Sequence, residues 1–265
     1  MVEEMPPPLE PVPGVTNSYS FGWRRLWKNF MDLLLAGIVY VVLLVVVGLV
    51  VGVAFSVGWR DSIPSLTNLL GGSTMTTFTW HFLIVSDILQ IFLFTPLFWG
   101  LLFLFFCAAA GRTVELQDLF LGFRRHYLRV AETSLLWWLV LSLPSNLVTV
   151  VNHFSGAAGV FLSVVWTIAS IFLYSHLIFV PFLLMDRQLF FTDAFRTSWE
   201  WSRGHALENF GIFVMGILVM IGGLIVFVAG VVPAAMWMGL AFASQYYAVT
   251  LEKGNPVVYP SPMMP

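Results

Sequence analysis

The chain has little of what enzymes and soluble domains usually depend on. It contains a single cysteine, Cys107, so no disulfide can form within it. Only 10% of its 265 residues are charged, whereas an ordinary soluble domain carries about 25%. It has no Ser/His/Asp motif, no phosphate-binding loop and no cluster of carboxylates within one apolar segment. We therefore expect a protein that is not an enzyme, and nothing in the sequence resembles a basic surface for nucleic acid.

Apolar sequence dominates the chain instead. Hydrophobic residues make up 59% of it, and its 25 Phe and 11 Trp residues are typical of proteins with aromatic belts at the bilayer surface. Long apolar runs predict an all-α, polytopic membrane protein with six transmembrane helices. Their predicted ranges are 33–57, 82–110, 134–151, 160–185, 210–229 and 234–249. They form a membrane domain at 18–253, between Pro-rich cytoplasmic tails at 1–17 and 254–265.

Three amphipathic segments accompany the predicted spans, and they are Phe21–Phe30, Leu116–Val130 and Thr192–Phe210. In the third, Trp199 lies on an aromatic stripe of the helix, whereas Arg196 and Arg203 lie on a charged stripe. A helix of this kind lies at a membrane surface, with its aromatic side chains at headgroup depth and its charges in water. We therefore predict three interfacial helices.

The first two segments share a short motif. Gly-Trp-Arg-Arg, which ends in Arg24 and Arg25, is echoed by Gly-Phe-Arg-Arg, which ends in Arg124 and Arg125. Each amphipathic segment precedes two predicted spans. The sequence therefore predicts three repeats, each consisting of an interfacial helix and a helical hairpin.

The basic residues also predict an orientation. With six spans, all of the 12 Lys and Arg residues except Arg60 fall on one side. Basic loops face the cytoplasm in most membrane proteins. We therefore expect a multi-pass protein of the inner (cytoplasmic) membrane with both termini in the cytoplasm.

A resemblance adds to this prediction. Residues 193–210, DAFRTSWEWSRGHALENF, are followed by a Gly-rich span, a Val-Val-Pro turn and a last span containing Gln-Tyr-Tyr. Together with FGWRRLWKNF near the start, they resemble a bacterial family of six-span membrane proteins. That family includes the membrane domain of some glycerophosphodiester phosphodiesterases and stand-alone relatives. The resemblance covers most of residues 18–252 and implies the fold, but no catalytic residues, since no phosphodiesterase domain is present in this sequence.

Three polar residues in the predicted spans, Asp87, Gln90 and Asn146, are candidates for an intramembrane polar site. A carboxylate in hydrocarbon is costly, so Asp87 could serve a proton or ion relay. The alternative, which we expect, is a hydrogen-bonded structural residue near the outer end of its span. Asn146 follows Pro144, where we expect the third span to be interrupted. Broken helices expose backbone groups to substrates in transporters, although neighbouring helices can also satisfy a kink.

A lone histidine, His176, lies in the fourth predicted span. It could ligate a haem or a chlorophyll-type pigment, or relay protons. A lone histidine in a helix more often makes a hydrogen bond to a neighbouring helix. We expect no other cofactor and no metal site.

Glycines at helical spacing mark two spans: Gly48 and Gly52 in the first, and Gly216, Gly223 and Gly230 in the fifth. Such residues allow close helix packing, either within this chain or against another. With no reactive group in view, we expect an accessory or scaffolding subunit whose partners are membrane lipids and other integral membrane proteins. The alternative is a transporter of a small molecule, ion or lipid, or a lipid-handling protein.

Overall fold

The structure is a computed structural model that describes residues 11–58, 84–124, 127–226 and 230–254. Within these ranges the chain forms helices and contains no strand. Five helices are long and apolar enough to cross a membrane, and they are Phe30–Val53, Ile84–Ala109, Tyr127–Asn152, Gly156–Arg187 and Ala206–Ile225. An all-helical chain with several candidate membrane spans is therefore confirmed. Most of both predicted tails lies outside the described residues.

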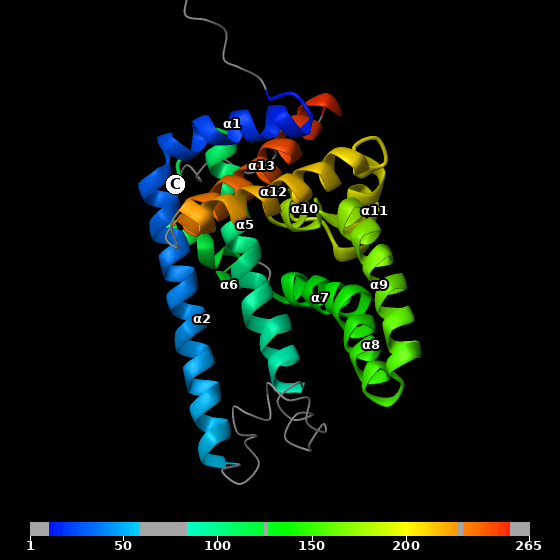
Figure 1. Cartoon of the computed structure of the whole chain (residues 1–265). Coiled ribbons are helices and arrows are strands. Elements are labelled where there is room, and N and C mark those ends of the chain that lie inside the picture. Colours follow the sequence, from blue (N-terminus) through cyan, green and yellow to red (C-terminus); the bar gives the residue numbers. More distant parts are fainter. Residues whose placement is uncertain (1–10, 59–83, 125–126, 227–229, 255–265) are drawn as a thin grey trace, which may run out of the picture.

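The first described helix is amphipathic, as expected, and leads directly into a span. α1 (Val15–Lys28) buries Tyr19 and Leu26 on one side and leaves its basic residues on the other. It begins within the range assigned to the N-terminal tail. The Asn29 backbone N–H bonds to carbonyls at the end of α1, and the chain then turns into α2 (Phe30–Gly58). Figure 1 shows α1 lying across one end of the molecule and α2 running away from it.

Two spans contain a wide π-helical turn just before a proline. The helix at 84–109 contains η2 (Gln90–Phe94) and then α5 (Thr95–Ala109), which includes Pro96. The next span consists of α7 (Tyr127–Trp137), η4 (Trp138–Ser142) and α8 (Leu143–Phe154), which includes Pro144. A proline ring clashes with the carbonyl four residues earlier, and a wider turn makes room for it. The expected interruption at Pro144 and Asn146 was therefore wrong, because the helix continues through the proline.

The predicted second interfacial helix, Leu116–Val130, is not one helix. Its first part is a 3₁₀ helix, η3 (Leu116–Phe120), followed by the single turn α6 (Leu121–Arg124). Residues from Tyr127 onward already belong to α7. The Tyr127 hydroxyl donates a hydrogen bond to the Phe92 carbonyl oxygen at 3.1 Å, and this contact holds the start of α7 against the preceding span.

The fourth predicted span is broken near its end, whereas the third is not. α9 (Gly156–Leu177) stops at a two-residue turn, and α10 (Val180–Arg187) follows with Pro181 in its first turn. α11 (Phe191–Ser202) is the third amphipathic helix, and α12 (Ala206–Val226) is the next span. The amphipathic segment Thr192–Phe210 therefore contains α11 and the first turn of α12.

The sixth predicted span corresponds to α13 (Val231–Glu252), which is not among the five candidate spans. It has 22 residues, enough to cross a bilayer, but Ser244, Gln245 and Tyr246 make it less apolar. All three side chains are fully buried. α13 therefore relies on the protein around it, not on lipid, to shelter its polar groups.

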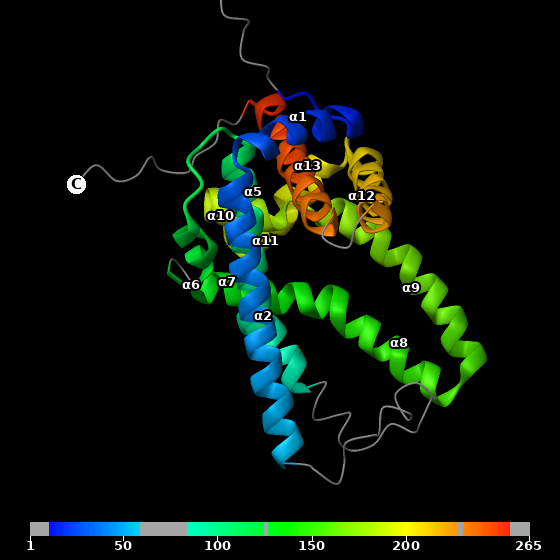
Figure 2. The ribbon, with the colours of Figure 1, turned by 60° about the vertical axis from the view of Figure 1, so that its left-hand side comes forward.

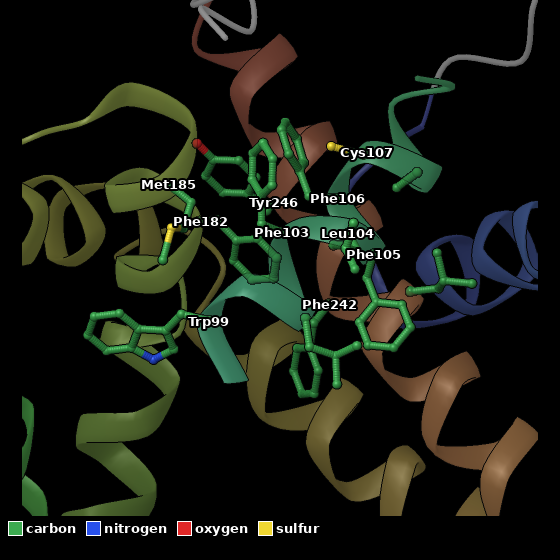
Figure 3. Packing of buried hydrophobic residues seen from close by; sticks show 14 of the residues in the cluster. Trp99, Phe103, Leu104, Phe105, Phe106, Cys107, Phe182, Met185, Phe242 and Tyr246 are labelled. Atoms are coloured by element: carbon green, nitrogen blue, oxygen red, sulfur yellow. The ribbon is translucent and has the colours of Figure 1, made fainter. Parts of the chain in front are cut away.

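The core lies where α13 meets α1, α5 and α10. Figure 3 shows aromatic rings from α5, α10 and α13 gathered there, and Tyr246 packs on Phe182 with ring centroids 5.1 Å apart. Figures 1 and 2 show that α1, α12 and α13 stay at this compact end of the molecule. In contrast, α2, residues 84–94 and α8 extend to an open end, where the spans diverge.

Candidate functional site

The open end brings together two of the three polar residues singled out in the spans. The Asn146 side-chain nitrogen donates a hydrogen bond to Oδ2 of Asp87 at 3.1 Å. Asp87 lies near the start of its span, and Asn146 lies on α8. Gln90 is exposed and does not line the same space. The structure thus pairs Asp87 with Asn146 and leaves Gln90 outside the pair.

A hollow of about 340 Å³ surrounds this pair. Its walls come from residues 84–91 on one side and from η4 and α8 on the other, and they are largely apolar: Ile84, Ile88, Ile91, Trp138, Leu143, Leu147 and Val150, with Thr149 beside them. The Trp138 ring nitrogen is buried and has no hydrogen-bond partner among the described residues. The hollow therefore offers one carboxylate and one amide within apolar walls.

Both helices that line the hollow contain a π turn, and a specific contact holds them together. Pro96 has no N–H to donate to the Phe92 carbonyl, which lies four residues before it. The hydroxyl of Tyr127 supplies a hydrogen bond to that oxygen. The span carrying Asp87 and the helix carrying Asn146 are thus joined beside the hollow.

His176 is enclosed by aromatic rings. Its Nδ1 lies 2.9 Å from the Phe172 carbonyl oxygen, so Nδ1 must carry the proton, because a carbonyl can only accept. The imidazole lies 4.3 Å from the Phe172 ring and 4.5 Å from the Trp199 ring, measured between centroids. Trp199, which we predicted to contact the membrane surface, therefore packs on α9. In the described ranges, no group of three or more His, Cys, Asp or Glu side chains could hold a metal ion.

The break between α9 and α10 frees backbone carbonyls, and buried side chains bind them. The Ser198 hydroxyl donates to the His176 carbonyl at 2.8 Å, and the Asn209 side chain donates to the Ser175 carbonyl at 3.0 Å. Ser198 and Asn209 are almost completely buried. Sequence reasoning missed both residues, although Pro181 is a signal that carbonyls just before it lack helical partners.

A second buried polar network joins α1, α12 and α13, and no pattern in the sequence predicted it. Its centre is Gln245, whose Oε1 accepts hydrogen bonds from the Gly14 backbone N–H and the Ser18 hydroxyl, each at 2.9 Å. Its Nε2 donates to Glu208 at 2.9 Å. His205 extends the network, with Nδ1 2.9 Å from Glu208 and Nε2 3.2 Å from Glu252.

The contact between α1 and α13 is also close and buried. The Trp237 ring nitrogen donates to the Tyr19 carbonyl at 2.8 Å, and the Tyr19 hydroxyl donates to the Ile212 carbonyl at 2.9 Å. Burial raises the pKa of Tyr19 to about 12. A Cβ added at Gly22 would lie only 3.2 Å from the Ala241 backbone nitrogen.

A buried acidic residue, Asp186, lies at the end of α10. It is 1% exposed, and Tyr246 donates to its Oδ2 at 3.3 Å. The Nε of Arg187 lies 4.0 Å from the same oxygen, and the Arg187 guanidinium lies 5.0 Å from the centroid of the Trp201 ring. This charge is therefore packed among aromatic rings of the core.

The two glycine stripes behave differently. A Cβ added at Gly216 would lie 2.5 Å from the Met238 sulfur, and one added at Gly223 would lie 2.6 Å from the Gly230 carbonyl oxygen. These glycines therefore pack α12 against α13 within the chain. At Gly48 and Gly52 on α2, an added Cβ would meet nothing within 4 Å.

The basic residues of the amphipathic segments are mostly exposed. Arg196 pairs with Glu200 at 3.0 Å on the surface of α11, and Arg124 donates to Gln117 at 3.2 Å. The guanidinium of Arg25 lies 5.2 Å from the centroid of the Phe21 ring. Arg24 and Arg203 are exposed, and Arg125 lies outside the described residues.

Comparisons of this chain with protein-family models, with curated proteins and with solved structures find no match. The resemblance to the six-span family therefore stays a prediction that rests on the motifs quoted above.

Proposed function

We propose that the protein is a non-catalytic integral membrane protein that serves as an accessory or scaffolding subunit of a larger membrane complex. The observation that carries this proposal is the exposure of α2, because only 6% of its most apolar 18-residue stretch is buried. Lipid can cover such a helix. Gly48 and Gly52, however, add a strip without side chains, where the backbone of a second helix can approach closely. A membrane helix of another protein would supply contacts that this chain does not make.

The same proposal includes a topology. The protein would lie in the inner membrane of a bacterium, with six spans in three repeats and both termini in the cytoplasm. One parallel supports the repeat: Gly22 packs α1 against the backbone of α13, and Gly122 packs α6 against the Pro96 carbonyl, where an added Cβ would lie 3.2 Å away. The exposed basic side chains on α1, α6 and near α11 support a common cytoplasmic face, and they are Arg24, Arg124, Arg196 and Arg203.

Extraction from native membranes in a mild detergent tests the scaffold function. Replacing Gly48 and Gly52 together with isoleucine fills the strip on α2 at positions where an added Cβ meets none of the described residues within 4 Å. We expect this double variant to lose the membrane proteins that co-purify with the wild type. Gly222→Ile is the matched control, because an added Cβ at that α12 glycine also meets nothing within 4 Å. A wild-type protein that purifies as a monodisperse monomer would contradict the scaffold function.

A second candidate function, transport of a small molecule, ion or lipid, is favoured by one observation. The hollow at the open end places Asp87 and Asn146 between apolar walls in a span. Proton entry into proteoliposomes, followed with an internal pH-sensitive dye, would favour this function if Asp87→Asn abolished it. Unchanged flux in the variant would favour the scaffold.

A further inference from the structure

We propose that the hollow between residues 84–91 and α8 binds an aminophospholipid, whose primary ammonium group pairs with Asp87. This inference goes beyond the scaffold function and does not depend on it, because the site would hold this lipid whether or not a protein partner binds α2. It rests on the charge of the site, the polar groups that line it and its depth in the span.

Asp87 has one hydrogen-bond partner among the described residues, the amide of Asn146, and no Lys, Arg or His of those residues lies within salt-bridge distance. A carboxylate surrounded by apolar groups is costly unless a cation or several donors pair with it. A primary ammonium group carries one positive charge and three N–H donors, so it would supply what the side chains around Asp87 do not.

The size and walls of the hollow suit one part of a lipid. Its volume of about 340 Å³ falls in the range of ligand sites, about 300–1,000 Å³. Ile88, Ile91, Leu143 and Leu147 make its walls apolar. They can bury the upper part of an acyl chain while the headgroup stays beside the polar pair.

Trp138 lines the same hollow farther along the helix. It precedes Asn146 by eight residues, about 12 Å along the helix axis, and α7, which ends at the residue before it, lies nearer the middle of the molecule than α8 does (Figure 1). Its indole, whose N–H is buried, extends the apolar wall along which an acyl chain can lie.

The depth of the pair fits a headgroup. Asp87 follows His81, at which the apolar run of its span begins, by only six residues, and the described part of this helix begins at the open end of the molecule (Figure 1). A carboxylate so close to the end of a span lies near the bilayer surface. The lipid would therefore belong to the leaflet at the open end.

Native mass spectrometry of the full chain released from bilayers tests the proposal. The bilayers contain equal amounts of phosphatidylethanolamine, phosphatidylcholine and phosphatidylglycerol. Of these, only phosphatidylethanolamine carries a primary ammonium group. We expect the wild type to retain phosphatidylethanolamine preferentially, and Asp87→Asn to reduce that retention about tenfold or more. Trp138→Leu, which removes most of the indole wall of the hollow, should reduce retention by a smaller factor.

The matched control is Asp32→Asn, which makes the same chemical change at an exposed carboxylate at the start of α2 and should leave lipid retention unchanged. A thermal melt of each variant separates loss of lipid from loss of fold. If Asp87→Asn fails to fold, the wild-type preference among the three lipids still decides. Equal retention of phosphatidylethanolamine and phosphatidylcholine by the wild type would overturn the proposal. Equal retention of phosphatidylethanolamine by the wild type and a folded Asp87→Asn variant would also do so. Displacement of the lipid by dodecylamine alone, without preference among the three lipids, would instead assign the site to free alkylamines.

Discussion

Gln245 is a fully buried side chain on which α1, α12 and α13 all depend. Its amide oxygen accepts two hydrogen bonds from the first described turn of the chain, and its nitrogen donates to Glu208. A glutamine can satisfy donors and an acceptor at once, which no apolar residue of similar size can do. The buried network is therefore a point where one substitution leaves several polar groups without partners.

Gln245→Leu should lower the free energy of unfolding by about 2–4 kcal/mol, because the Ser18 hydroxyl, the Gly14 N–H and Glu208 would each lose a partner. Denaturant or thermal unfolding in detergent measures the change. Gln90→Leu provides the control, since Gln90 is exposed and the same chemical change there should cost little. If the two variants have the same free energy of unfolding, the Gln245 network does not stabilise the fold.

At the scale of elements, the break between α9 and α10 is held by side chains from elsewhere in the chain. A helix that stops in the protein interior leaves carbonyls that must find other donors. Here Ser198 on α11 and Asn209 on α12 supply them. The break thus resembles the broken helices of transporters in its backbone. Its Ser175 and His176 carbonyls, however, accept hydrogen bonds from side chains of the same protein.

Replacing Ser198 with alanine and Asn209 with leucine should loosen this break. We expect faster amide hydrogen exchange at residues 178–184 and a loss of about 2–4 kcal/mol in the free energy of unfolding, since two buried carbonyls would go unpaired. Hydrogen exchange followed by mass spectrometry reports on the segment directly. Thr167→Ala removes a hydrogen bond on the exposed surface of α9 and should change neither quantity. Unchanged exchange in the double variant would mean that these side chains do not hold the break.

At the scale of the whole molecule, the proposed orientation can be tested with two cysteines. Ser155 and Gly204 are exposed. Ser155 lies just before the candidate span Gly156–Arg187, and Gly204 lies beyond the other end of that span, between α11 and α12. In a Cys107→Ala background, a cysteine at Ser155 should react with an impermeant thiol reagent added to intact cells. A cysteine at Gly204 should react only after the cells are opened. The reverse pattern would invert the topology.

The sequence was most informative about the helices, because a bilayer requires long apolar runs in the spans and amphipathic stripes in helices at its surface. It was least informative about how each proline would be accommodated. Pro144 was expected to break a helix, but a π turn absorbs it, whereas Pro181 does follow a real break. The choice depends on whether neighbouring side chains can bind the freed carbonyls, and spacing along one sequence does not show this.

The candidate site was also only partly predictable. Asp87 and Asn146 could be singled out because polar side chains in apolar spans are rare. Their pairing depends on how η2 and η4 set the two helices against each other, which no local pattern encodes. Gln245 and Asn209 were missed for a related reason, since each is a single polar residue whose partners lie in distant segments.

The seat of α1 on α13 joins the first described helix to the last one, and this imposes an order on biosynthesis. When α1 leaves the ribosome, its buried face, with Tyr19 and Leu26, lacks most of its partners until α12 and α13 have been made. α13, in turn, carries Gln245 into the membrane domain and finds the matching groups only on segments made earlier. The compact end can therefore close only after α13 is made. Until then the newly made chain presents the uncovered face of α1, where a membrane chaperone or a nearby subunit could bind.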